Sequence, residues 1–117
     1  MSFPPCDLVV GIAQGGIAPA TLIAYILGRE LRIVHFNFRN QDNTPVHPQP
    51  VLLNEITIPA GVKRILLVDD VSVSGKTLKA AKDLLAQYEV TSFVLRGKAD
   101  YVLFPEIDYC VKWPWKV

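Results

Sequence analysis

The sequence contains few residues that bind metals or form cross-links. It has two cysteines in 117 residues, Cys6 and Cys110, with no Cys-x-x-Cys motif and no paired-histidine spacing, so a zinc site is not indicated. We expect two buried free thiols, with a disulfide between them as the alternative. His35 falls in an apolar strand pattern and His47 lies between prolines, so neither is assigned to a site.

An excess of one charge and long apolar runs are also missing. Twelve basic and 11 acidic residues give a formal net charge of +1, which provides no electrostatic basis for binding nucleic acid or an anionic membrane. The longest apolar segments are far shorter than a membrane span, and the N-terminus has no basic region or cleavable signal pattern. We therefore expect a cytoplasmic protein with no membrane or nucleic-acid partner.

What is present is the composition and periodicity of one α/β domain covering residues 1–117. Half of the residues are hydrophobic and a fifth are charged. Strands are predicted at 8–10, 31–38, 51–58, 65–68, 91–95 and 101–104, and helices at 17–27, ending at Gly28, and at about 76–88. This alternation predicts a doubly wound, mostly parallel twisted sheet flanked by helices.

The segment from Arg64 to Leu78 is the most informative one. The apolar run 65–68 is followed directly by Asp69 and Asp70, then by a small-residue turn at 72–75 and a helix. Carboxylates at the carboxyl end of a parallel strand lie where open α/β sheets bind ligands. A serine/glycine turn before a helix presents N–H groups and the helix dipole to a phosphate. The combination indicates a sugar phosphate; the alternative is an ordinary strand–turn–helix with a capping serine.

A second candidate loop, residues 11–16, lies between the first strand and the first helix. Its glycines allow close approach of the backbone to an anion, although a tight turn without a ligand is the alternative. The loop lacks the Gly-x-Gly-x-x-Gly spacing of a dinucleotide site. The sequence Gly75-Lys76-Thr77 matches the end of a P-loop, but Asp70 stands where that loop needs a glycine.

These two segments resemble the binding motifs of type I phosphoribosyltransferases, and the chain is most similar to the xanthine-guanine and archaeal purine branch. The resemblance implies that Asp69 and Asp70 are the catalytic pair, which holds the ribose hydroxyls of phosphoribosyl pyrophosphate (PRPP). It also implies Mg²⁺ held indirectly near them, through PRPP oxygens and water. Two loops complete the implied PRPP site: a 5′-phosphate loop of Val73, Ser74, Gly75, Lys76 and Thr77, and a pyrophosphate loop of Ala13, Gln14, Gly15 and Gly16, with a cis bond before Gln14.

The resemblance further implies a nucleobase site under a hood-like C-terminal tail at about 100–117. Lys98, or failing that Arg96, would contact the 6-oxygen of a purine, and Val111 would offer its backbone carbonyl. Tyr109, Cys110 and Trp113 complete this expected base site; core packing is the alternative for Trp113 and Trp115. The loop 39–50 could close over the site, with Arg39 as an additional charge.

The chain departs from the family pattern at three functional positions. Gln14 replaces a basic residue, Val73 an acidic residue and Cys110 a stacking aromatic residue. The usual N-terminal helix before the first strand is also missing, which would reduce the base site. The leading hypothesis is a purine phosphoribosyltransferase acting on PRPP and a guanine-, xanthine- or hypoxanthine-type base, as a homodimer or higher homo-oligomer. The alternatives are a catalytically reduced sensor of PRPP or a nucleoside monophosphate, and a structural partner subunit.

Overall fold

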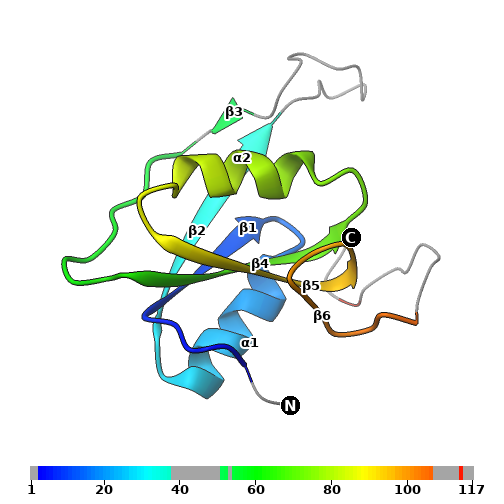
Figure 1. Ribbon diagram of the computed structural model, residues 1–117, viewed down its shortest axis with the longest axis horizontal. Coiled ribbons are helices and arrows are strands. Elements are labelled where there is room, and N and C mark those ends of the chain that lie inside the picture. The colour runs from blue at the N-terminus through cyan, green and yellow to red at the C-terminus, as the bar shows by residue number, and fades with distance from the viewer. Residues whose placement is uncertain (1–2, 38–50, 53, 107–113, 115–117) are drawn as a thin grey trace.

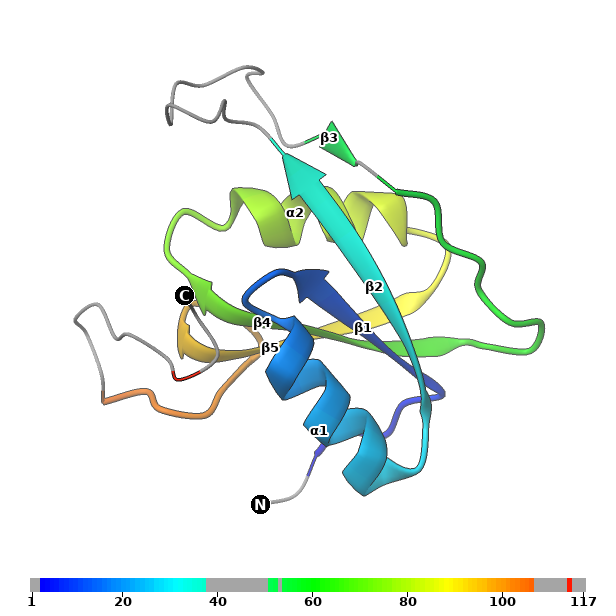
Figure 2. The same cartoon turned by 180° about the vertical axis from the view of Figure 1, so that it is seen from behind.

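The computed structural model describes residues 3–37, 51–52, 54–106 and 114. Its strands are β1 (Leu8–Ala13), β2 (Glu30–Asn37), β3 (Val51–Leu52), β4 (Arg64–Ser72), β5 (Glu89–Gly97) and β6 (Tyr101–Val102), and its helices are α1 (Ile17–Leu27) and α2 (Lys76–Leu84). The sheet order is β3-β2-β1-β4-β5-β6, with every pairing parallel except that of β3 with β2. The two helices cover opposite faces of the sheet (Figures 1 and 2). The doubly wound fold predicted from the sequence is confirmed.

Strand β4 lies at the centre because its apolar residues pack against both helical layers. Leu66 and Val68 belong to the cluster that contains α1, and Ile65 and Leu67 to the cluster that contains α2. All four side chains are at most 1% exposed. A continuous apolar run, rather than an alternating one, is what a strand covered on both faces requires.

Helix α1 matches its predicted bounds at both ends, whereas α2 matches only at its start. Helix α1 has the predicted bounds and ends at Gly28, which is left-handed at φ 65°. Helix α2 ends at Leu84, four residues before the predicted end. The chain leaves the helix there to enter β5, whose first residue, Glu89, donates its N–H to the Lys63 carbonyl at 2.9 Å. No helix in the described ranges is long and apolar enough to cross a membrane.

The strand predicted at 51–58 is wrong beyond Leu52. The side chain of Asn54 takes the place of the backbone ladder along β2. Its Oδ1 accepts the N–H of His35 at 2.7 Å, and its Nδ2 donates to the carbonyl of Ile33 at 2.8 Å. Because the edge groups of β2 are satisfied by a side chain, the backbone from Asn54 onward is free to turn away from the sheet.

Cys6 fits the expected free thiol. It is buried and free, and burial raises the pKa of its thiol. Such a thiol packs as a small apolar group and has little thiolate character. Cys110 lies outside the described residues.

We expect Leu67→Ala to lower the free energy of unfolding by about 2–5 kcal/mol, because it opens a cavity at a fully buried position of the central strand. The matched control is Leu22→Ala on α1, where the side chain is 60% exposed and the change should stay within about 0.5 kcal/mol. Urea denaturation followed by circular dichroism measures both. Equal losses in the two variants would contradict the central position of β4.

Candidate functional site

The candidate site begins where β1 and β4 separate. Their pairing ends at Gly11 and Val68. Beyond that point β1 stays paired with β2 as far as Ala13, and β4 stays paired with β5 as far as Ser72. The two strands therefore part at their carboxyl ends, β1 toward β2 on one side and β4 toward β5 on the other. Open α/β sheets hold their ligands in a crevice at this point.

The glycine loop after β1 folds back into this opening. Gly16 donates its N–H to the Ile12 carbonyl at 2.8 Å. A Cβ atom at Gly16 would lie 2.5 Å from that same oxygen and 2.6 Å from the carbonyl oxygen of Val68, so a side chain does not fit there. A Cβ atom at Gly15 would overlap the carboxylate of Asp70. The loop predicted to hold pyrophosphate is thus packed directly against the acidic pair, and its Ala13–Gln14 bond is cis.

Asp69 and Asp70 lie inside β4 rather than after its end, because the strand continues to Ser72. Both are buried, at 8% and 5% exposure. Asp69 Oδ1 accepts the N–H of Asp70 at 2.8 Å, and Asp70 Oδ1 accepts the N–H of Val71 at 2.8 Å. Each carboxylate is therefore oriented by the backbone of the following residue. Asp69 lines the cavity of the next loop, while Asp70 contacts the glycine loop, so the pair connects the two.

The predicted phosphate loop forms a cavity of about 150 Å³ at the start of α2. It is lined by Asp69, Val71, Ser72, Val73, Ser74, Gly75, Thr77 and Leu78. Gly75 is the N-cap of α2 and offers no side-chain cap, so first-turn N–H groups remain for an anion. Ser74 Oγ accepts the N–H of Lys76 at 3.3 Å, and Lys76 itself is exposed and does not line the cavity. Val73 is 72% exposed, an apolar side chain at the rim of a polar site.

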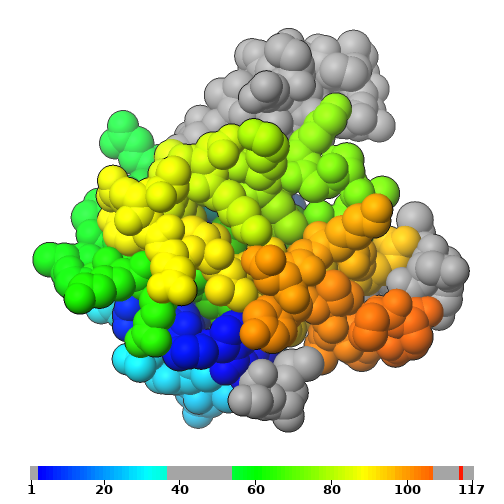
Figure 3. All heavy atoms as spheres, in the orientation of Figure 1, coloured from blue at the N-terminus to red at the C-terminus, as the bar shows by residue number. Residues whose placement is uncertain are grey.

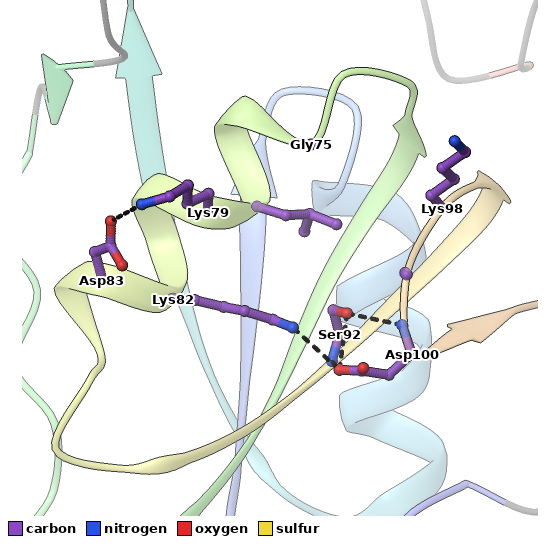
Figure 4. A pocket seen from close by; sticks show the side chains of 9 residues that line it. Gly75, Lys79, Lys82, Asp83, Ser92, Lys98 and Asp100 are labelled. Carbon is purple, nitrogen blue, oxygen red and sulfur yellow. Dashed lines mark hydrogen bonds and ion pairs between the residues drawn. The ribbon is translucent and has the colours of Figure 1, made fainter.

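The two basic residues predicted for the base site occupy different environments. Lys98 follows β5 and lines a second, open cavity of about 400 Å³, which shares Gly75 and Leu78 with the phosphate loop (Figure 4). Arg96 pairs with Val71 across the sheet, and its Nε is buried without a hydrogen-bond partner among the described residues. Lys98 therefore lines a cavity that adjoins the phosphate loop, whereas Arg96 lies within β5 beside β4.

Several predicted site residues lie outside the described part of the chain. They are Tyr109, Cys110, Val111 and Trp113, together with the loop 39–50 and its Arg39. Of the tail expected at about 100–117, residues 100–106, which include β6, and Pro114 are described. The predicted roles of the residues outside these ranges stay predictions.

Ser72 is a polar residue that the sequence interpretation did not select. It is 6% exposed, it lines the phosphate-loop cavity, and its Oγ has no hydrogen-bond partner among the described residues. A buried hydroxyl without a partner costs free energy unless a ligand or water satisfies it. The available sequence signal was a serine two positions after the acidic pair.

The donor set fits the indirect magnesium binding expected from the sequence. Within the described residues no group of three or more His, Cys, Asp or Glu side chains could form a complete protein cage for a metal. Two adjacent carboxylates are the kind of partial ligand set that Mg²⁺ uses together with water and substrate phosphates. Asp69 and Asp70 are the residues that would hold it.

A sequence model described as the phosphoribosyl transferase domain matches residues 6–114. The transcriptional regulator GfcR of Methanocella arvoryzae is 33% identical over 81 residues, covering 68% of this chain and 39% of that protein. The bifunctional protein PyrR of Ralstonia nicotianae is 35% identical over 109 residues, covering 84% of this chain and 61% of that protein. This chain thus spans less than two thirds of either curated relative. A solved structure of purine phosphoribosyltransferase from Pyrococcus horikoshii superposes with a TM-score of 0.69 at 28% identity, covering 83% of this chain and 69% of the other.

The contact between Gly15 and Asp70 gives a direct test of the crevice. We expect Gly15→Ala to lower the free energy of unfolding by about 1–3 kcal/mol, because its methyl group meets the Asp70 carboxylate. In an Asp70→Ala background the same substitution should cost much less, since the overlapping atoms are gone. Urea denaturation of the four proteins of this double-mutant cycle measures the coupling. Additive losses would show that the glycine loop and the Asp70 carboxylate are not in contact.

Proposed function

Because this chain belongs to the phosphoribosyl transferase family, we propose that it transfers the 5-phosphoribosyl group of PRPP to a ring nitrogen of a purine base and releases pyrophosphate. The observation that carries the proposal is the contact between the glycine loop and Asp70 at the place where β1 and β4 part. Asp70 adjoins the glycine loop and Asp69 lines the phosphate-loop cavity, which supports one binding site formed by both loops and the acidic pair. PRPP is a ribose with a pyrophosphate at C1 and a phosphate at C5, which matches that order of binding groups.

In this proposal the carboxylates of Asp69 and Asp70 accept hydrogen bonds from the 2′- and 3′-hydroxyls of the ribose. The N–H groups at the start of α2, with the hydroxyls of Ser74 and Thr77, bind the 5′-phosphate. Backbone N–H groups of the loop 13–16 other than that of Gly16, which is bonded to the Ile12 carbonyl, would donate to the pyrophosphate, on which negative charge develops as the bond to C1 breaks. Binding and orientation then supply most of the rate acceleration.

Mg²⁺ bound to PRPP oxygens near the carboxylate pair would neutralise part of the charge on the leaving pyrophosphate. Backbone N–H groups of the two loops would also stabilise this charge, because their dipoles are fixed in position. Their burial matters, because interactions between charges and dipoles strengthen where water is excluded.

The purine class of the base is the finer part of the proposal. Its support is the likeness to the archaeal purine enzyme and the position of Lys98, whose ammonium group can donate to an exocyclic oxygen. Guanine, xanthine and hypoxanthine all carry such an oxygen at the 6-position. The homo-oligomer and the cytoplasmic location expected from the sequence stay predictions.

A second candidate function is a sensor that binds PRPP or a nucleoside monophosphate without turnover. Two observations favour it. Gln14 leaves the glycine loop without a side-chain cation, and the exposed Val73 cannot transfer a proton. A similar protein is also named as a transcriptional regulator, which supports a regulatory role.

An assay of pyrophosphate release separates the two functions. The chain with Mg²⁺ and PRPP is incubated with guanine, xanthine, hypoxanthine or adenine, and with uracil and orotate as pyrimidine controls. We expect release with at least one 6-oxopurine and none with the pyrimidines. Release with a pyrimidine alone would contradict the purine class. Calorimetric binding of PRPP by a folded chain that releases nothing with any base would establish the sensor instead.

Both functions depend on the acidic pair. We expect the double variant Asp69→Asn, Asp70→Asn to weaken PRPP binding by roughly 10- to 100-fold, since hydrogen bonds to charged groups contribute about 1.5–3 kcal/mol. Asparagine keeps the oxygen that accepts each backbone N–H, so the strand should stay intact. The measurement is isothermal titration calorimetry, with Asp83→Asn on the exposed face of α2 as control. Unchanged affinity in the double variant would place the ribose elsewhere.

The missing cation in the glycine loop gives a gain-of-function prediction. We expect Gln14→Lys to raise kcat/KM by about tenfold, which corresponds to about 1.4 kcal/mol of added transition-state stabilisation. Gln14→Met, a side chain of similar length without charge, should not raise it. Steady-state kinetics with PRPP as the varied substrate gives both values. An equal response to lysine and methionine would show that charge at this position does not limit the reaction.

A further inference from the structure

Asp100, outside the predicted site, is the centre of a compact hydrogen-bond network. Its Oδ2 accepts the backbone N–H of Ser92 at 2.9 Å, the Ser92 hydroxyl at 3.0 Å and the Lys82 ammonium at 3.2 Å. The Asp100 N–H in turn donates to Ser92 Oγ at 2.9 Å. Figure 4 shows Lys82 reaching from α2 to this carboxylate. We call the three residues Lys82, Ser92 and Asp100 the Asp100 clamp.

The Asp100 clamp pairs the polar groups of a buried serine with an ionised carboxylate. Ser92 is 1% exposed on β5, so its hydroxyl and N–H would be costly to leave unpaired. The hydrogen bond from the Ser92 backbone N–H, supported by Lys82 and the Ser92 hydroxyl, lowers the pKa of Asp100 against the opposing effect of burial. Asp100 is therefore ionised at neutral pH and holds the bend that joins β5 to β6.

The same bend carries Lys98, and its other end is fixed to β4. The Lys98 N–H donates to the Ser72 carbonyl at 2.8 Å. Gly97, at φ 109°, makes that approach possible, since a Cβ atom there would overlap the carbonyl group of Ser72. The bend is therefore held at Lys98 by the strand of the acidic pair and at Asp100 by β5 and α2. In the space-filling view the orange surface that follows β5 borders the yellow-green surface of α2 (Figure 3).

The Asp100 clamp also leaves the Lys98 ammonium available. Among the described residues Lys98 forms no ion pair, although Asp100 lies only two positions away. Ser92 and Lys82 already engage the Asp100 carboxylate, and Figure 4 shows the Lys98 ammonium pointing away from it. The Lys98 ammonium sits on a flexible stem, so a fixed backbone limits the positions it can occupy. It remains available to a ligand because its nearest carboxylate is bonded to other groups.

We propose that Asp100 is a positioning residue, which through Ser92 and Lys82 fixes the bend that aims Lys98 at the base of a bound nucleotide. The inference rests on the proposed function, because Lys98 has a base to contact only if the chain binds a nucleotide or a nucleobase beside the phosphate loop. Asp100 acts through Lys98 and touches no ligand itself. It should therefore affect recognition of the base and not of the ribose phosphate.

The test compares two ligands that differ only by the base, guanosine 5′-monophosphate and ribose 5-phosphate, by calorimetry. Relative to the original chain, Asp100→Ala should weaken binding of the nucleotide by about tenfold, the loss expected for one or two hydrogen bonds, and leave ribose 5-phosphate within about twofold. Asp100→Asn keeps an acceptor for the Ser92 groups and should restore nucleotide binding to within about threefold. Glu30→Ala breaks the exposed Arg32–Glu30 pair on β2, away from the cavity that Lys98 lines, and should change neither ligand.

The double variant Lys98→Ala, Asp100→Ala decides whether Asp100 acts through Lys98. Its nucleotide affinity should equal that of Lys98→Ala alone. Additive losses would overturn the inference, as would a loss of ribose 5-phosphate binding in Asp100→Ala that matches the loss for the nucleotide. If Lys98→Ala weakens nucleotide binding and Asp100→Ala does not, the base contact stands and the positioning role is rejected. If the original chain binds neither ligand, the proposed function fails and this inference with it.

Discussion

The separation of β1 from β4 after Gly11 and Val68 is the constraint on which the candidate site depends. Neighbouring parallel strands normally satisfy each other's backbone groups along their whole length. Here each strand continues with its outer neighbour only, and the glycine loop fills the opening, with the Gly16 N–H on the Ile12 carbonyl. A side chain at Gly15 or Gly16 would push the loop out of the opening, away from Asp70 and Val68. The absence of two side chains thus allows the glycine loop to lie against strand β4.

In the proposed site, backbone groups would take the role that charged side chains have in many anion sites. The glycine loop has Gln14 where a cation would strengthen anion binding, and Lys76 does not line the phosphate-loop cavity. The available donors are N–H groups at the start of α2 and the hydroxyls of Ser72, Ser74 and Thr77. Neutral donors bind a phosphate more weakly than ammonium or guanidinium groups do, but they hold its position with little reorganisation. A site of this kind suits binding at least as well as rapid turnover.

The bend between β5 and β6 connects this site to the rest of the sheet. Ser72 contributes its side chain to the phosphate-loop cavity and its carbonyl to the Lys98 N–H. Lys82 connects the same bend to the helix that begins at the phosphate loop. Ser72 at the end of β4 and Lys82 on α2 therefore fix the position of Lys98 relative to the phosphate-loop cavity. Hydrogen bonds to buried partners such as Ser92 make that relation rigid.

The succession of strands and helices along the chain, and the placing of two candidate loops between a strand and a helix, followed from the sequence alone. Apolar periodicity, glycine position and adjacent carboxylates are local properties, and local properties suffice for elements of regular structure. The end of the third strand could not be predicted from the sequence. There the Asn54 side chain replaces backbone hydrogen bonds through contacts with residues 19 and 21 positions away along the chain. The extension of β4 through Asp70, the contact of Asp70 with Gly15 and the Asp100 clamp were likewise decided by tertiary structure. Each joins residues far apart in sequence, and only packing of the whole sheet sets the distance between them.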